Sequence, residues 1–408
     1  MIINRGGLVM AVVVQKYGGS SVGTTEKIKG IAQNIVNRKK ENTDLVIVVS
    51  AMGDTTDDLI SLSKGITEEP DKRELDALLS TGEIISSALL AMAIKALGYD
   101  AISYTAHQIG IQTSGQYGKA LIEDIHDKKI KKSLKEGKIV IVAGFQGING
   151  EGDITTLGRG GSDTTAVALA VKLKGSCEIY TDVAGIYSVD PRAYSEAKKL
   201  EEIEYEEMLE LASLGAQVMH SRSIELAQKY GIPIYVGLSN SDIKGTVIRE
   251  VKNMNMESKP VTGIATSDED VAVTLQRIPK DVNILSTIFE TIGSKRINID
   301  MISQTSPIDG KVNVSFTIPK ESLKDGLEII SGLIVDNKVI VDEDITKFSM
   351  VGLGMKTTSG VAARMFRIFS ENNIEIKMIT TSEIRITCAI KTEDKLKAIQ
   401  VIAKEFNL

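Results

Sequence analysis

The sequence has few of the residues on which nucleic-acid-binding and disulfide-stabilised proteins depend. Its 408 residues include no Trp, seven Phe, two Cys and three His, and the formal net charge is −6. Nucleic-acid-binding surfaces neutralise phosphates with clustered Lys and Arg and stack bases on aromatic rings. The composition therefore argues against a nucleic-acid partner. Cys177 and Cys388 lie far apart without CxxC spacing, which indicates a reducing compartment and excludes a cysteine-based zinc site.

Long apolar runs and metal-binding patterns are also lacking. The most apolar stretch, residues 84–97, is interrupted by two Ser and one Lys, so we interpret it as a buried helix and expect no membrane partner. The three His, at 107, 126 and 220, are scattered, and we predict no metal-ligating residues. Residues 1–15 lack a small-residue cleavage site and lead directly into QKYGGSS, which favours a first buried strand. We expect a cytoplasmic protein in which residues 1–9 precede a natural start at Met10.

The length and the 42% hydrophobic content are sufficient for two or three domains. From residue 10 to about 249, short β-branched runs alternate with helical stretches. The strand candidates are AVVVQ, LVIVVSA, AISYT, KIVIVAGF, EIYTD and PIYVGL, and helices are predicted over 25–40, 74–97, 165–174 and 205–230. Strands that are apolar on both faces and separated by helices indicate an α/β fold, with a mostly parallel sheet covered by helices.

Polar and glycine-rich segments follow these strands at their carboxyl ends. Ligands of such sheets bind beyond the carboxyl ends of the strands, which lie along one rim. We therefore expect a ligand site at this rim. The residues concerned are Lys16, Gly18, Gly19 and Ser20, then Ser50, Gly53, Asp54 and Thr56, then Gly144, Phe145 and Gly147, and finally Thr181 and Asp182.

The stretch TTLGRGGSDTTAVALAV, residues 155–171, joins a glycine-rich loop to a predicted helix. Its three glycines free the backbone for close approach to a ligand, and Arg159 adds a fixed positive charge between them. Ser162 and Asp163 open the helical run, where unpaired N–H groups and the helix dipole favour anions. An ordinary loop and N-cap would give the same glycines and serine. Such a turn needs neither the Arg nor the carboxylate, which favours an anion site.

A second glycine-rich segment, KYGGSSVG, follows the first predicted strand. It has neither the GxxxxGK[ST] order of a Walker loop nor the GxGxxG of a dinucleotide fold, because Lys16 precedes the glycines. Lys16 with Gly18 and Gly19 still supplies a charge and an approachable backbone for phosphate oxygens. Taken alone, the motif fits a solvated Lys before a turn equally well.

Six motifs, taken in order, resemble the aspartate kinases of the amino acid kinase family. They are KYGGSSVG, VVSAMGDTTDDL, STGEIISSALLA, GFQG, TTLGRGGSDTTA and EIYTDVAGIYSVDPR. The resemblance continues to the C-terminus. It implies transfer of the γ-phosphoryl group of ATP, bound with Mg²⁺, to the side-chain carboxylate of L-aspartate. The product would be 4-phospho-L-aspartate, at the first step of lysine, threonine and methionine biosynthesis.

The resemblance also implies roles for residues at matching positions. Lys16 would neutralise the transferring phosphoryl group and Asp163 would hold Lys16 in place. Arg159 would pair with the α-carboxylate of aspartate and Glu83 with its ammonium group. Further substrate contacts are implied for Ser50, Thr56 and Ser162, and nucleotide contacts for Lys16, Tyr17, Gly18, Gly19, Thr181, Asp182, Tyr187 and Arg192. The chain departs from many relatives at Gln217 of GAQVMH, where they have Lys, which leaves a detail of ATP binding open.

The region after residue 248 contains an internal repeat behind the polar linker VKNMNMESKP. Residues 288–306 align with 365–383, and each copy is predicted as strand, loop, helix, strand, strand. Both copies resemble ACT domains, small amino-acid-sensing modules of ferredoxin-like α+β fold. We expect a kinase domain over 10–248 and a regulatory region over 249–408. Its ACT domains would be interleaved, one covering about 264–340 and the other 250–263 plus 345–408.

The ACT resemblance implies effector contacts in both copies. These are Lys280, Asn283 and Leu285 in a loop after the first strand, with Asn298, Ile299, Asp300 and Gln304, and in the second copy Thr380, Thr381 and Ser382. We expect inhibition by lysine, alone or jointly with threonine, although relatives often have DxPG where this chain has Lys280–Asn283. A homo-oligomer formed through the ACT domains is expected. Met254 and Met256 raise the hypothesis of a separately translated regulatory chain that joins a heteromer.

The sequence leaves two alternative functions for the chain. For the repeat, it also leaves the alternative of a scaffold that only mediates dimerisation. One of the two functions is another kinase of the same family that acts on glutamate or acetylglutamate, against which Glu83, Arg159 and the ACT pair argue. The other is a non-catalytic amino-acid sensor with a decayed kinase fold. A decayed site would be expected to lose Lys16, Arg159 and Asp163, and all three are present.

Overall fold

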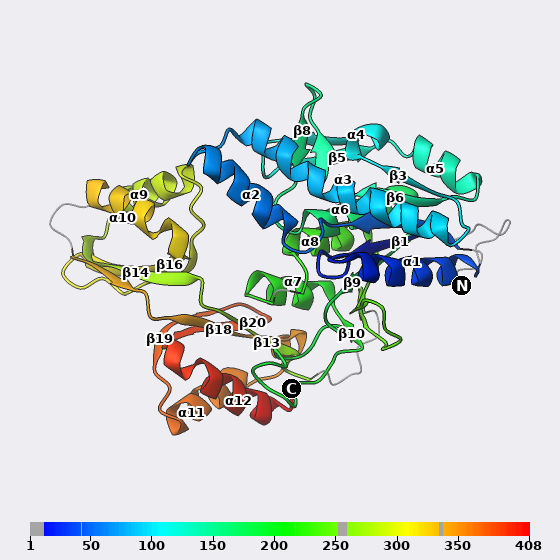
Figure 1. Cartoon of the computed structure of the whole chain (residues 1–408). Coiled ribbons are helices and arrows are strands. Elements are labelled where there is room, and N and C mark those ends of the chain that lie inside the picture. The colour runs from blue at the N-terminus through cyan, green and yellow to red at the C-terminus, as the bar shows by residue number, and fades with distance from the viewer. Residues whose placement is uncertain (1–11, 42, 217, 252–258, 334–337) are drawn as a thin grey trace. The chain divides into compact units, whose positions relative to one another are not determined.

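The computed structural model describes residues 12–41, 43–216, 218–251, 259–333 and 338–408 (Figure 1). The chain forms two compact units. The first contains the described residues up to Ile186, together with Lys199–Ala212 and residues 218–251. The second contains Tyr187–Lys198, Ser213–Ala216 and the described residues from 259 onward. Each unit has its own sheets and its own buried core.

The first unit is built on an eight-stranded sheet, and the predicted mostly parallel arrangement is confirmed. The strands follow the order β10-β12-β11-β9-β1-β2-β6-β3, and only β12 pairs antiparallel, with β11. Their bounds are β1 Val12–Tyr17, β2 Asp44–Val49, β3 Ala101–Tyr104, β6 Ile139–Ala143, β9 Ser176–Thr181, β10 Glu202–Ile203, β11 Ile234–Leu238 and β12 Thr246–Ile248. All six strand candidates lie in this sheet.

Alternation along the strands assigns side chains to the two faces of the sheet. Val13, Tyr17 and Ile47 share a buried cluster with residues of α1 (Thr25–Lys39) and α3 (Lys72–Ala96), which lie on one side of the sheet (Figure 1). Val12, Val14 and Lys16 alternate with these residues along β1 and face the opposite side of the sheet. There α6 (Gly161–Leu173) packs against β1 and β2, and α8 (Ser221–Tyr230) packs against α6. Lys16 therefore points towards α6.

The remaining elements of this unit surround the rim. They are α2 Thr55–Ile66, α4 Ala106–Ile109, α5 Lys128–Lys135, and a smaller sheet of β4 Ile111–Ser114, β5 Leu121–Ile125, β7 Gln146–Ile148 and β8 Ile154–Thr156. In the described part of the chain, α3 is the one helix long and apolar enough to cross a membrane, and half of its most apolar window is buried inside the protein.

The single helix predicted over residues 205–230 is wrong. The structure has two helices, α7 (Tyr205–Ser213) and α8, and the chain leaves the helical conformation between them at Gly215, whose φ is +119°. Glycine adopts this conformation without the steric cost that a side chain brings. The helix predicted over 165–174 begins earlier than expected, because α6 starts at Gly161 and not at Thr165. Ser162 and Asp163 therefore lie within its first turn.

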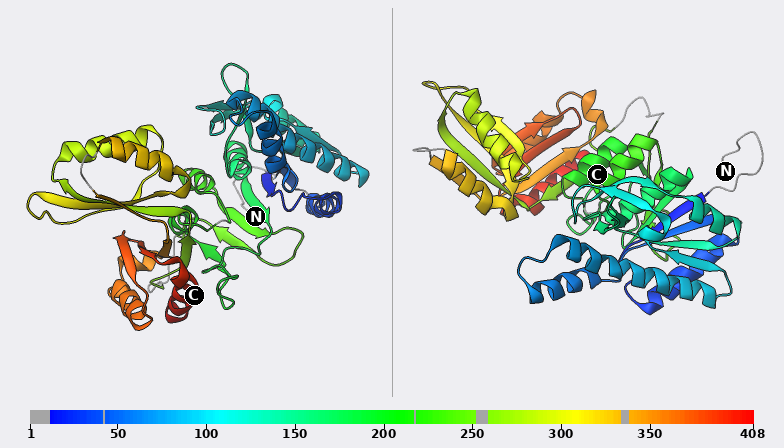
Figure 2. Two further views of the ribbon diagram at one scale, coloured as in Figure 1. Left: turned by 60° about the vertical axis from the view of Figure 1, so that its left-hand side comes forward. Right: turned by 90° about the horizontal axis from the view of Figure 1, so that it is seen from above.

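The second unit contains two similar modules, each with one four-stranded antiparallel sheet. In the first, β14 Asp270–Pro279, α9 Val282–Ser294, β15 Asp300–Gln304, β16 Lys311–Pro319, α10 Leu323–Leu333 and β17 Lys338–Asp342 give the order β15-β16-β14-β17. In the second, β18 Thr346–Val351, α11 Val361–Glu371, β19 Ile376–Thr381, β20 Arg385–Ile390 and α12 Lys395–Phe406 follow the same plan. Figure 2 shows the two helices of each module along one face of its sheet. The repeat pattern had not revealed α10 and α12.

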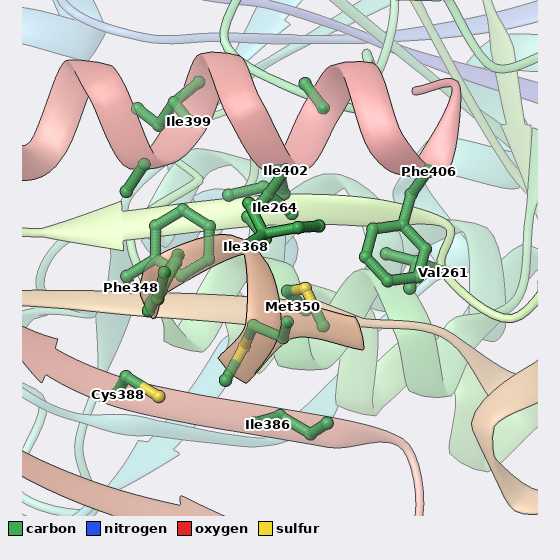
Figure 3. Packing of buried hydrophobic residues seen from close by; sticks show 14 of the residues in the cluster. Val261, Ile264, Phe348, Met350, Ile368, Ile386, Cys388, Ile399, Ile402 and Phe406 are labelled. Atoms are coloured by element: carbon green, nitrogen blue, oxygen red, sulfur yellow. The ribbon is translucent and has the colours of Figure 1, made fainter. Parts of the chain in front are cut away.

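The sheet of the second module is completed by a strand that precedes the first module. β13 (Gly263–Ser267) pairs antiparallel with β18 and gives the order β13-β18-β20-β19. Val261 and Ile264 thereby reach the core that contains Phe348 and Phe406 (Figure 3). β13 occupies the place that β17 takes in the first module. The two modules are thus interleaved along the chain.

Candidate active site

An ion pair between Lys16 and Asp163 lies at the carboxyl end of β1. Lys16 Nζ is 2.6 Å from Asp163 Oδ1, and both residues are less than 10% exposed. The alternation of β1 directs Lys16 towards α6, and Asp163 is the third residue of that helix. Burying an unpaired charge is costly, so each group fixes the other. The pair presents one ammonium group in a defined position at the rim.

The glycines after β1 bring two loops into close contact. Gly18 N–H donates to the Tyr180 carbonyl at 3.2 Å, and Gly53 N–H donates to the Gly19 carbonyl at 3.1 Å. A Cβ at Gly19 would lie 2.9 Å from the Ala51 carbonyl oxygen, a separation that real Cβ atoms avoid. A Cβ at Gly18 would lie 3.6 Å from Lys16 Nζ. The backbone at Gly18 therefore passes directly beside the Lys16 ammonium group.

Glu83 is a buried carboxylate at the same rim. It is 3% exposed, and its Oε1 accepts a hydrogen bond from Ala51 N–H at 3.1 Å. Within the described residues, its Oε2 has no hydrogen-bond partner. Burial, which penalises the charged form, raises the pKa of Glu83 to about 7. A ligand cation would both satisfy the free oxygen and stabilise the ionised carboxylate.

The predicted hydroxyl residues follow two strands and open two helices. Ser50 directly follows β2, and its carbonyl accepts a hydrogen bond from Ser86 Oγ at 2.7 Å. Thr56 is the second residue of α2 and is half-buried. Ser162 Oγ lies 2.9 Å from the position that a Cβ on Gly144 would occupy, so the loop after β6 passes the start of α6. Backbone N–H groups at this helix start favour an anion.

Arg159 lies in the loop between β8 and α6 and is exposed. No residue in the described ranges forms a hydrogen bond or ion pair with its side chain. Gly158 next to it has φ +77°, and a Cβ there would lie 2.8 Å from the Gly118 carbonyl oxygen. The guanidinium is therefore available to a ligand, and the position of the Arg159 Cα is set by the backbone of this loop.

The predicted nucleotide contacts are divided between the two units. Thr181 ends β9, beside β1, and its hydroxyl donates to Asp182 Oδ1 at 2.9 Å. Tyr187 and Arg192 belong to Tyr187–Lys198, which packs with the second unit, and the Arg192 guanidinium pairs with Asp190 at 2.8 Å. Gln217 lies outside the described residues. Tyr17 and its neighbours Gly18 and Gly19 are at the rim in the first unit.

The carboxylates at the rim fit a metal that arrives with phosphate. Among the described residues, no group of three or more His, Cys, Asp or Glu side chains is placed to hold a metal ion. Asp163, in the first turn of α6, and Asp182, directly after β9, nevertheless lie along the rim. Mg²⁺ usually keeps several waters and binds to one or two carboxylates together with substrate phosphates. The donor set suits Mg²⁺ in that form and not in an all-protein cage.

Apart from Glu83, the buried polar residues of α3 and the half-buried Arg222 of α8 were not predicted from the sequence. Asp76, Ser80, Glu83 and Ser87 are all at most 3% exposed and repeat at helical spacing along α3. This polar stripe within an apolar helix was a detectable signal, of which only Glu83 was recognised. Asp76 accepts three hydrogen bonds from the segments that flank Arg159. Arg222 of α8 donates two hydrogen bonds to the same segments.

In the first regulatory module, the predicted effector loop is shorter than expected. α9 begins at Val282, because the Asp281 side chain caps it by accepting from Asn283 N–H at 2.9 Å. Lys280 remains in the connection from β14, whereas Asn283 and Leu285 lie in the helix. Asn298 and Ile299 precede β15, and Asp300 and Gln304 are its first and last residues.

The predicted effector segments of the two modules meet within the second unit. Thr380 and Thr381 end β19, which lies against β15, and Ser382 follows. Thr380 Oγ1 is buried, and no described residue forms a hydrogen bond with it. Lys347 is 7% exposed and pairs with Asp270 at 3.1 Å and with Asp300 at 3.0 Å. A buried Lys with two carboxylates thus joins β18 to the first module.

Comparison with known proteins gives two family matches. Residues 11–237 match the model of the amino acid kinase family, and residues 271–332 and 348–406 match an ACT domain model. An aspartokinase of Bacillus sp. (strain MGA3) is 46% identical over 403 residues, which is 98% of each chain. Aspartokinase 2 of Bacillus subtilis (strain 168) is 44% identical over 403 residues, again 98% of each chain.

The structural comparison agrees with the family matches in fold. E. coli aspartokinase III, solved in complex with aspartate and ADP, aligns with a TM-score of 0.82 over 96% of this chain and 99% of that chain, at 24% identity. The α/β sheet with helices on its faces and the two small modules that follow therefore recur in that structure.

Proposed function

We propose a function that follows from the family, since the chain belongs to the aspartokinases of the amino acid kinase family. The protein transfers the γ-phosphoryl group of ATP to the side-chain carboxylate of L-aspartate. The product is 4-phospho-L-aspartate, the first intermediate towards lysine, threonine and methionine. The observation that carries the proposal is the buried Lys16–Asp163 pair, 2.6 Å apart where the two glycine-rich segments meet.

Phosphoryl transfer to a carboxylate needs positioning and charge neutralisation more than proton transfer. The acceptor carboxylate is already ionised at neutral pH, so no general base is required. Lys16 neutralises the negative charge on the phosphoryl oxygens, and Asp163 keeps its ammonium group aimed at them. A preorganised charge in a water-poor site stabilises the transition state more strongly than a mobile charge in solvent.

A zwitterionic substrate is recognised by charges of both signs. Glu83 offers its unpartnered Oε2 to the substrate ammonium group, and Arg159 pairs with the α-carboxylate. Ser50, Thr56 and Ser162 complete the contacts to substrate and phosphate. This charge set supports aspartate over acetylglutamate, whose acetylated nitrogen carries no positive charge for Glu83.

ATP is bound at the backbone of Tyr17, Gly18 and Gly19 and at the first turn of α6. Thr181, Asp182, Tyr187 and Arg192 contribute the remaining nucleotide contacts. Mg²⁺ bound to the triphosphate would supply further charge neutralisation, and Asp163 in the first turn of α6 and Asp182 after β9 are carboxylates that would hold it. The chain's own contribution is to hold the phosphates beside Lys16.

Regulation is assigned to residues 249–408 and catalysis to residues 10–248. Lysine, alone or jointly with threonine, binds where β15 and β19 meet and inhibits the kinase, which works in the cytoplasm as a homo-oligomer joined by its ACT domains. Met254 and Met256, the hypothesised internal starts of a separate regulatory chain, lie outside the described residues. N-terminal sequencing of native material would detect the shorter chain, and full-length chain alone would refute the hypothesis.

The proposed reaction is tested by trapping the acyl phosphate with hydroxylamine. The full-length protein is incubated with ATP, Mg²⁺ and either aspartate, glutamate or acetylglutamate, and the hydroxamate is measured. We expect a signal with aspartate that exceeds the others at least tenfold. A signal that favours glutamate or acetylglutamate would support a different kinase of the family, and no signal with any acid would support a non-catalytic sensor.

A further inference from the structure

We infer that Asp76 of α3 and Arg222 of α8 are positioning residues that hold the backbone beside Arg159 and thereby set how well the site selects an α-carboxylate. The inference rests on the proposed function, in which Arg159 binds that carboxylate. Neither residue would touch the substrate. Both are separated from the substrate by the segment that they hold.

Asp76 fastens two segments of the smaller sheet to α3. Its Oδ2 accepts hydrogen bonds from Thr156 N–H at 2.7 Å and Gly118 N–H at 2.9 Å, and its Oδ1 accepts from Thr156 Oγ1 at 2.7 Å. Asp76 is 1% exposed, and these three donors balance its buried charge. Thr156 is three residues before Arg159. The carboxylate therefore fixes the last residue of β8 before the loop begins.

Arg222 holds the same two segments from the other side. Its Nη1 donates to the Leu157 carbonyl at 2.9 Å, and its Nη2 donates to the Ala120 carbonyl at 2.8 Å. Ala120 N–H in turn donates to the Thr156 carbonyl at 3.0 Å. A planar guanidinium can bridge two carbonyls in a fixed geometry, which Lys cannot reproduce. Residues 118–120 and 156–157 are thus tied together by a carboxylate and a guanidinium.

The tie matters because the Arg159 side chain depends on its backbone for its position. Its side chain is exposed and has no hydrogen bond or ion pair with any described residue. The backbone leading to it is constrained by Gly158, whose φ of +77° brings it against the Gly118 carbonyl. A shift of the 118–120 segment would therefore move the base of the Arg159 side chain. Misplacement of a binding group by about 1 Å can cost two orders of magnitude in rate.

The first test uses steady-state kinetics of the full-length protein with aspartate and ATP varied separately. A misplaced Arg159 loses its hydrogen bonds to the substrate carboxylate, and losing a hydrogen bond between charged groups typically weakens binding about tenfold or more. Asp76→Asn should therefore raise KM for aspartate about tenfold, with KM for ATP unchanged within about twofold. Thr156→Val removes only the hydroxyl bond and should give a smaller change of the same kind. If Asp76→Asn does not fold, the KM of Thr156→Val for aspartate tests the inference in its place.

A second readout separates positioning from general damage to the fold. β-Alanine has the reacting carboxylate and the ammonium group of aspartate but lacks the α-carboxylate. The ratio of kcat/KM for aspartate to that for β-alanine should fall about tenfold in Asp76→Asn and in Arg222→Met. Arg222→Lys should not restore the ratio, because one ammonium group cannot replace the two-pronged guanidinium. A loosened fold would lower both activities together and leave the ratio unchanged.

A double-mutant cycle tests whether Asp76 acts through Arg159. In an Arg159→Ala background, Asp76→Asn should raise KM for aspartate by less than about twofold. The matched control is Arg73→Gln, which removes an exposed ion pair between α3 and Asp153, 2.8 Å long, and should leave the substrate ratio unchanged. An additive effect in the Arg159→Ala background, or an unchanged ratio in both Asp76→Asn and Thr156→Val, would overturn the inference. Absence of aspartyl hydroxamate with the unaltered protein would instead refute the proposed function.

Discussion

The rim of the first unit and the strand edges of the second unit present polar groups in opposite ways. At the rim, Lys16, Glu83 and Asp163 are ionisable and less than 10% exposed. At the end of β19, Thr381 and Ser382 are neutral hydroxyl residues and are exposed. Buried charge is costly and is kept where it is paired, as at Lys347 in the second unit, or where a reaction or a strong ligand contact uses it. Exposed hydroxyls cost little and can bind an effector weakly and reversibly. The comparison assigns chemistry to the rim and control to the edges.

The largest expected effect is the loss of the rim's buried ammonium group. Lys16→Ala should lower kcat by about 10²- to 10³-fold, because it removes a preorganised charge from the transition state and leaves Asp163 buried without its partner. Asp163→Ala should have a similar effect, since Lys16 then loses its orientation. Single-turnover hydroxamate formation measures the chemical step directly. Circular dichroism shows whether the fold is kept.

A second ion pair on α6 provides the matched control. Lys172 pairs with Asp124 at 2.6 Å, the same separation as in the Lys16–Asp163 pair, but both of its partners are substantially exposed. Exposed pairs contribute about 0–1 kcal/mol to stability. Lys172→Ala should leave kcat unchanged within about twofold. If Lys16→Ala turned over as fast as Lys172→Ala, the contrast between rim and surface would lose its catalytic meaning.

A smaller effect is expected from the ionisation of Glu83. With a pKa of about 7, the free enzyme should gain kcat/KM for aspartate about tenfold between pH 6 and pH 8, as the carboxylate becomes able to bind the ammonium group. Glu83→Gln should have low and pH-independent kcat/KM in that range. A pH profile of the two proteins over this interval checks the expectation. The same slope in Glu83→Gln would show that another group titrates.

The raised pKa of Glu83 also predicts how stability changes with pH. The folded protein holds this proton more tightly than the unfolded chain, whose carboxyl has an ordinary pKa near 4.5. The free energy of unfolding should therefore fall as pH rises from about 4.5 through 7, by at most about 3 kcal/mol. Glu83→Gln should remove this decline. Urea unfolding of both proteins at pH 5 and pH 8 measures the change in the free energy of unfolding. An equal loss in the unaltered protein and in Glu83→Gln would show that Glu83 is not the group responsible.

The rim was largely predictable because its features are local in the sequence. Short β-branched runs predicted the six strands, and four of them were followed by glycine-rich or polar residues that were expected to share one rim. The tie that Asp76 and Arg222 form between residues 118–120 and 156–157 was not predictable from local patterns. Its partners are 42 to 102 residues away in the sequence, and all except the Thr156 hydroxyl are backbone groups, which carry no sequence signature. The error over 205–230 had a local cause, because one Gly interrupted an otherwise helical pattern.

The regulatory region was predictable as a repeat but not in its full topology. Aligned residues such as Ile297 and Ile374 occupy equivalent buried positions in the two modules, so the repeat was a reliable signal. The role of β13 depends on pairing with β18, about 80 residues later, which no periodicity reveals. The meeting of β15 with β19 likewise depends on tertiary packing. Sequence alone therefore gave the predicted effector segments without bringing them together.

The smallest expected effect concerns control at the strand edges. Thr380 Oγ1 is buried without a hydrogen-bond partner among the described residues, on a strand that lies against β15. An effector that donates a hydrogen bond there would favour one arrangement of the modules, with a coupling free energy of about 1 to 3 kcal/mol in total. One hydroxyl contributes only part of this, so Thr380→Val should raise the lysine concentration for half-inhibition by about three- to tenfold. Uninhibited turnover should change less than twofold, because the proposed phosphoryl-transfer site lies in the first unit.

Gln304→Leu should act in the same direction from the β15 side, and substitutions at Thr381 and Ser382 should act more weakly because those residues are exposed. Thr291→Val is the control within the same unit, since its hydroxyl donates to the carbonyl of Thr287 in its own helix. Initial rates are measured at saturating ATP and aspartate across titrations of lysine, of threonine and of both together. Inhibition curves of Thr380→Val that superimpose on those of the unaltered protein, while basal activity collapses, would place Thr380 in the folding core. The contrast between a buried charged rim for chemistry and neutral strand edges for control would then fail at the edges.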